Sequence, residues 1–79
     1  MNSRTAQQAG LDSHRLGLQL VSALGDASVP LMLRTLLKTA QVELQAWHEG
    51  RSTRGLTIAA HALAEWHRWR GAISYGPAR

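Results

Sequence analysis

Apolar residues recur at helical spacing along most of the chain, and three segments carry this pattern. The first, residues 12–24, is expected to form a short helix with one apolar face, made of Leu16, Leu20, Ala23 and Leu24. Asp12 or Ser13 can cap its first turn, and Gly25 is placed to end it in the left-handed conformation. The polar residues 1–10 before it predict a disordered tail.

The second segment predicts a long helix from Val29 to about Glu49, ended by Gly50. Residues 26–28 form the linker before it, with Ser28 as a candidate N-cap and Pro30 in the first turn. Its apolar positions follow steps of 4, 3, 4 and 3, the spacing of a coiled-coil seam: Leu33, Leu37, Ala40, Leu44 and Trp47. Met32 and Leu36 widen this seam, and the other face carries the polar residues Arg34, Lys38, Gln41, Gln45 and His48.

The third segment predicts a helix that starts after Ser52 or Thr53 and runs to about Arg70, with Gly71 as its stop. It is apolar around most of its circumference, at Leu56, Ile58, Ala59, Ala60, Ala62, Leu63, Trp66 and Trp69. The short turn before it makes the two long helices antiparallel neighbours. No segment alternates as a strand would. We therefore expect an all-α fold of three helices, a short N-terminal helix plus a long antiparallel helical hairpin. They form one domain over residues 11–75, with a C-terminal tail at 76–79.

The amino-acid composition limits the classes of function that the chain can have. A chain of 79 residues without cysteine has no disulfide or thiolate metal site to support a small core. Nine Lys+Arg against five Asp+Glu give a net charge of +4, which favours nucleic acid, anionic lipid or an acidic partner without choosing among them. No apolar run has the length of a membrane-spanning helix or a secretory signal, so we expect a cytoplasmic protein.

Candidate chemistry is sparse. His61 and Glu65 lie one helical turn apart, but His67 points to another face and no third ligand completes a metal set. A nucleophile–base set and a glycine-rich phosphate loop are also missing. We expect no catalytic residue, no metal and no cofactor, and hence no enzyme. The turn at residues 50–55 lies between helices that are too long for a compact DNA-reading unit.

The third helix carries more apolar surface than a two-helix hairpin can bury, which indicates a protein partner. Its end combines aromatic, basic and aliphatic side chains, and we predict a binding surface at Trp66, Trp69, Arg70 and Ile73. The partner is either a helical protein or another copy of the chain. Interleaved Trp and Arg are also typical of nucleic-acid surfaces, so a small basic nucleic-acid-associated regulator is an alternative. A phage- or plasmid-type antagonist that binds a host regulator is another.

The runs 33–45 and 59–64, LRTLLKTAQVELQ and AAHALA, sit on the two arms of the predicted hairpin. In this arrangement, over roughly residues 29–75, the chain resembles the small helical-hairpin cochaperones of bacterial type III secretion. It differs from them in charge and in Trp content. The resemblance implies pairing with a helical chaperone or secreted subunit, because those cochaperones act with a helical-repeat chaperone to keep the needle subunit soluble in the cytoplasm. It implies no particular binding residues.

Overall fold

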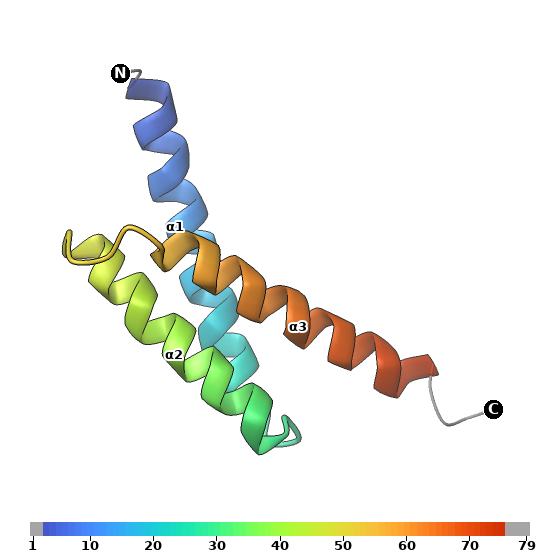
Figure 1. The fold of residues 1–79 in the computed structure, drawn as a ribbon. Helices are drawn as coiled ribbons and strands as arrows, with labels where there is room; N and C mark the ends of the chain where they lie inside the picture. The colour runs from blue at the N-terminus through green and yellow to red at the C-terminus, as the bar shows by residue number, and fades with distance from the viewer. Residues whose placement is uncertain (1–2, 76–79) are drawn as a thin grey trace.

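The computed structural model describes residues 3–75, and its side chains from Gln8 to Ile73. Three helices make up the fold: α1 (Ser3–Leu24), α2 (Leu31–His48) and α3 (Gly55–Tyr75). Helices α2 and α3 form an antiparallel hairpin, and α1 crosses it in contact with both (Figure 1). No strand occurs in residues 3–75, so the predicted all-α class with three helices is confirmed. The tail predicted at residues 76–79 lies outside the described part.

Helix α1 is longer than its apolar face suggested. It begins at Ser3 rather than near Asp12, so residues 3–10 are helical where we expected an irregular tail. This stretch contains no proline and only one glycine, and nothing in it breaks a helix. The Gln8 side chain also donates a hydrogen bond of 3.0 Å to the Asp12 carboxylate one turn later.

The turn between α1 and α2 is held by side chains that cap the backbone. The Asp26 carboxylate accepts hydrogen bonds from the Ser28 hydroxyl (2.6 Å) and the Ser28 backbone N–H (2.9 Å). These bonds lower the pKa of Asp26. Because the Ser28 hydroxyl bonds to Asp26, it does not cap α2, and the N-cap position is Pro30. Arg34, expected on the polar face, donates instead to the carbonyls of Leu24 (3.0 Å) and Asp26 (2.8 Å), where a cation complements the end of α1.

The C-terminus of α2 ends as predicted at Gly50, which has a φ of +76°. The Gly50 N–H bonds to the Trp47 carbonyl (3.1 Å) and the Arg51 N–H to the Ala46 carbonyl (2.8 Å), the paired bonds of a Schellman motif. Gly25 was expected to share this conformation, but Gly50 is the one glycine with positive φ in residues 3–75. Helix α1 ends without a left-handed residue: the Gly25 and Asp26 N–H groups bond to the carbonyls of its last turn, and Arg34 bonds to that of Leu24.

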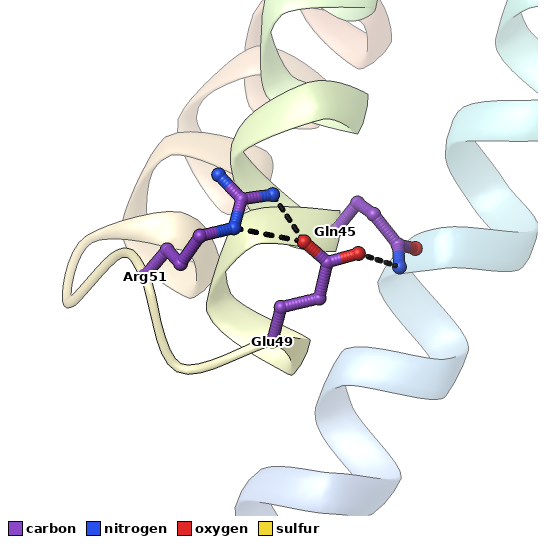
Figure 2. Close-up of polar contacts among 3 residues, drawn as sticks. All are labelled: Gln45, Glu49 and Arg51. Atoms are coloured by element: carbon purple, nitrogen blue, oxygen red, sulfur yellow. Dashed lines mark hydrogen bonds and ion pairs between the residues drawn. The ribbon is translucent and has the colours of Figure 1, made fainter.

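A side-chain cluster reinforces this turn (Figure 2). The Glu49 carboxylate accepts a hydrogen bond of 3.0 Å from the Gln45 amide and pairs with the Arg51 guanidinium through the other oxygen. The Gln45 bond, followed by the Arg51 contact, lowers the pKa of Glu49. The cluster links the last turn of α2 to Arg51, the third residue after the helix.

The core contains the apolar faces predicted for all three helices. Its buried members come from α1, the α1–α2 turn and the two arms of the hairpin: Leu20, Ala23, Val29, Leu37, Ala40, Leu44, Ala59, Ala62, Leu63 and Trp66. Leu33, Trp47 and Leu56, at the ends of the predicted seam, are partly buried. The predicted helix phase is therefore confirmed. Met32 is an exception, because it is 86% exposed and does not widen the seam.

Helix α3 continues through Gly71 to Tyr75, so the predicted stop at Gly71 is wrong. A glycine weakens a helix by about 1 kcal/mol but does not end it unless its backbone turns left-handed. Gly71 does not have a positive φ. The last turns of α3 consequently extend beyond the hairpin (Figure 1).

Gly55 permits the closest approach between the arms of the hairpin. A Cβ atom at Gly55 would lie 2.5 Å from the carbonyl oxygen of Glu43 and would also overlap the Cβ of Trp47. Both obstacles are backbone or backbone-proximal atoms, so they cannot move without separating the helices. We expect Gly55→Ala to lower the free energy of unfolding by about 2 kcal/mol, measured by urea denaturation.

Gly17→Ala is the matched control for that substitution. A Cβ at Gly17 would meet Leu44 at 3.7 Å, an ordinary van der Waals contact, inside a continuous helix. Alanine should stabilise the chain there by about 0.5–1 kcal/mol. If both variants changed stability in the same direction, the close contact at Gly55 would not set the spacing of the hairpin.

Candidate interaction surface

The four residues predicted to bind a partner occupy one end of α3 but differ in exposure. Trp66 is only 6% exposed and belongs to the core. Trp69 is partly buried and packs against that core. Arg70 is exposed, with its guanidinium carbon 4.6 Å from the centre of the Trp66 ring, and Ile73 is 55% exposed. Only Trp69, Arg70 and Ile73 therefore present side chains to another molecule.

Arg70 also contributes to the fold itself. Its stacking over Trp66 is a cation–π contact that covers the outer face of the ring. Its charge also helps to lower the pKa of Asp26, after the Ser28 bonds, so the α1–α2 turn lies within its field. An acidic group of the same chain, Asp26, is thus already near Arg70.

A row of exposed apolar side chains along one face of α1 was missed by the sequence analysis. Leu11, Leu18 and Val21 are 62%, 60% and 61% exposed. They fall at i, i+7 and i+10, so they share one face, which we call the α1 stripe. The signal was present as a second row of apolar residues in the same helix. It was overlooked because the row that includes Leu16 and Leu20 already accounted for the packing of a short helix.

Helix α2 adds three exposed apolar side chains in other places. Leu31 and Met32 lie in its first turn, and Val42 lies on the face that the seam leaves to solvent. Single exposed apolar residues are common on protein surfaces and require no special explanation. The row along α1 is different because three such residues follow one another on a single face.

A serine–histidine contact joins α1 to α2. The Ser13 hydroxyl lies 2.5 Å from Nε2 of His48, and Ser13 is fully buried. A nucleophilic serine needs access to its substrate and a group that orients its base. Ser13 has no access, and His48 contacts no carboxylate among the described side chains. The contact therefore links the two helices, although His48 itself remains exposed on α2.

The pair considered for metal binding is not assembled as a site. Glu65 bonds to Arg68 at 2.8 Å, and His61 is exposed on the same helix. Across the described residues, no group of three or more His, Asp or Glu side chains could hold a metal ion.

Comparison with known protein families, curated proteins and solved structures found no match to this chain. Within residues 3–75, no helix has both the length and the apolar character needed to cross a membrane.

Proposed function

We propose that this chain is a small, non-enzymatic protein–protein interaction module of the cytoplasm that binds a helical partner through the α1 stripe. One observation carries the proposal: Leu11, Leu18 and Val21 lie on one face of α1 and are each about 60% exposed. Steps of seven and three residues are the spacing at which a second helix packs its own apolar side chains. Covering these three side chains would contribute about 1 kcal/mol or more each.

The resemblance to type III secretion cochaperones supports a helical chaperone or a secreted subunit as the class of partner. Trp69, Arg70 and Ile73 at the end of α3 form the second surface of this proposal. A partner that covers both surfaces would contact α1 and α3.

Charge placement favours a protein partner over nucleic acid. Binding to a phosphate backbone requires several free cations on one surface. Four of the arginines are already engaged within the chain: Arg34 with backbone carbonyls, Arg51 and Arg68 with carboxylates, and Arg70 with Trp66. The other cations with described side chains, Arg15, Lys38 and Arg54, lie on α1, on α2 and in the α2–α3 turn, so they do not add up to one continuous binding face.

Leu18→Glu tests the proposal by placing a charge in the middle of the α1 stripe. We expect it to abolish capture of the partner from cells that contain the chain's gene, while helicity and melting temperature stay close to those of the original chain. Val42→Glu is the matched control, since Val42 is equally exposed but lies on α2. Capture that survives Leu18→Glu, or that Val42→Glu removes equally well, would contradict the proposal.

A further inference from the structure

A shallow groove runs between α1 and α3, next to the α1 stripe. Its volume is about 460 Å³, and its lining consists of Asp12, Arg15, Leu16, Leu56, Thr57 and Ala60. Leu16 and Leu56 are partly buried, whereas Thr57 and Ala60 are small and exposed. Small side chains on α3 leave room for another helix to approach, so the groove has the shape of a vacant helix position in a bundle.

The α1 wall of this groove carries one acid and one base that do not pair with each other. Asp12 accepts a hydrogen bond only from the neutral Gln8 amide, and Arg15 has no carboxylate within 4 Å among the described side chains. Glu49 and Glu65, by contrast, each pair with a nearby arginine. Asp12 and Arg15 are thus an acid and a base on one surface, both available to charges from outside.

We infer that this groove binds the same groove of a second copy of the chain, with the two α1 helices antiparallel across a two-fold axis. If the axis passes midway between residues 13 and 14, each residue lies at the axial level of the one whose number completes a sum of 27. Asp12 of each copy then faces Arg15 of the other, which forms two reciprocal ion pairs. Leu11 and Leu16 flank these charges on α1, so the contact also covers the exposed Leu11.

The charges of Asp12 and Arg15 make this surface complementary to itself, which favours a second copy of the chain as the occupant. A two-fold interface must match a surface to itself, and an acid and a base one turn apart do so in antiparallel helices. An acidic partner helix would be opposed by Asp12 and a basic one by Arg15.

The dimer should be weak. The groove and the neighbouring part of α1 offer less surface than the roughly 800 Å² per partner of a standard stable interface. We expect a dissociation constant in the range of about 10–100 µM. Ion pairs at the rim select the register, and the leucines supply most of the affinity.

Charge reversal tests the register directly by sedimentation velocity at 5–300 µM. The original chain should pass from monomer to dimer in this range. Arg15→Glu and Asp12→Arg should each weaken dimerisation at least tenfold, because each places like charges opposite one another. An equimolar mixture of the two variants should form a heterodimer, since every contact is then complementary. Arg54→Glu, an equal change of charge in the α2–α3 turn, should dimerise like the original chain.

Three results would overturn the inference. The first is an original chain that remains monomeric at 300 µM, and the second is an Arg15→Glu variant that dimerises as well as Arg54→Glu. The third is a mixture that stays monomeric although both variants are helical by circular dichroism. None of these affects the capture test at Leu18, so a failure of the dimer and a failure of the proposed function are distinguishable.

Discussion

Leu37→Asp should leave the chain unfolded at 25 °C. Leu37 is fully buried where α2 meets the other two helices, and it is among the largest side chains with no exposure. Removing the leucine side chain from such a position costs about 2–5 kcal/mol, and burying an unpaired polar or charged group costs several more. A single-core domain of this size is stabilised by only about 3–5 kcal/mol. The helical circular dichroism signal should therefore be lost.

Val42→Asp is the control for this prediction. Val42 lies on the same helix, but it is 66% exposed, so aspartate replaces an apolar group that already contacts water. We expect its melting temperature to remain within a few degrees of the original value, since surface changes usually alter stability by about 0.5 kcal/mol or less. Equal losses in the two variants would mean that the assigned buried face of α2 is wrong.

The buried faces were predictable from the sequence because a helix repeats its geometry. Leu37, Ala40 and Leu44 follow the seam spacing, and one face of a helix must pack when only three helices build the core. The ends of the helices were less predictable. Glycine at position 50 ends its helix, whereas Gly71 lies within one, and the difference is a backbone angle that the residue type permits but does not impose.

The surfaces were harder to predict than the core. Arg34 and His48 were assigned to the polar face of α2, yet one caps α1 and the other bonds to Ser13. Both contacts depend on where α1 crosses the hairpin. The crossing position is a property of packing among three helices, and no spacing within a single helix encodes it. The α1 stripe was missed for a related reason, because which of two apolar rows faces outward depends on the same crossing.

Trp66 shows how burial and hydrogen bonding can oppose each other in this core. Its indole N–H is buried and has no acceptor in the described part of the chain, an arrangement that weakens the gain from burying the ring. Arg70 covers one face of the ring, and the His67 ring lies 4.9 Å away at a tilted angle. The large apolar area of the indole outweighs the unsatisfied donor, so Trp66 still acts as a core residue.

Trp66→Ala and Trp69→Ala should separate fold stability from binding. Trp66→Ala empties a buried position and should cost about 3–5 kcal/mol, enough to unfold most of the population. Trp66→Phe keeps a ring and removes the unpartnered N–H, so it should retain much of the stability. Trp69 is partly buried, and its truncation should cost the fold about 1–2 kcal/mol.

Partner binding should depend more on Trp69 than on Trp66, the reverse of the order expected for fold stability. An exposed aromatic edge beside Ile73 is the kind of anchor whose removal often costs 2 kcal/mol or more in binding. Trp69→Ala should therefore reduce partner capture more strongly than Trp66→Phe, although both remain folded by circular dichroism. If Trp69→Ala lowers the melting temperature as much as Trp66→Ala and leaves capture unchanged, Trp69 is a core residue. The end of α3 would then not belong to the binding surface, which would consist of the α1 stripe alone.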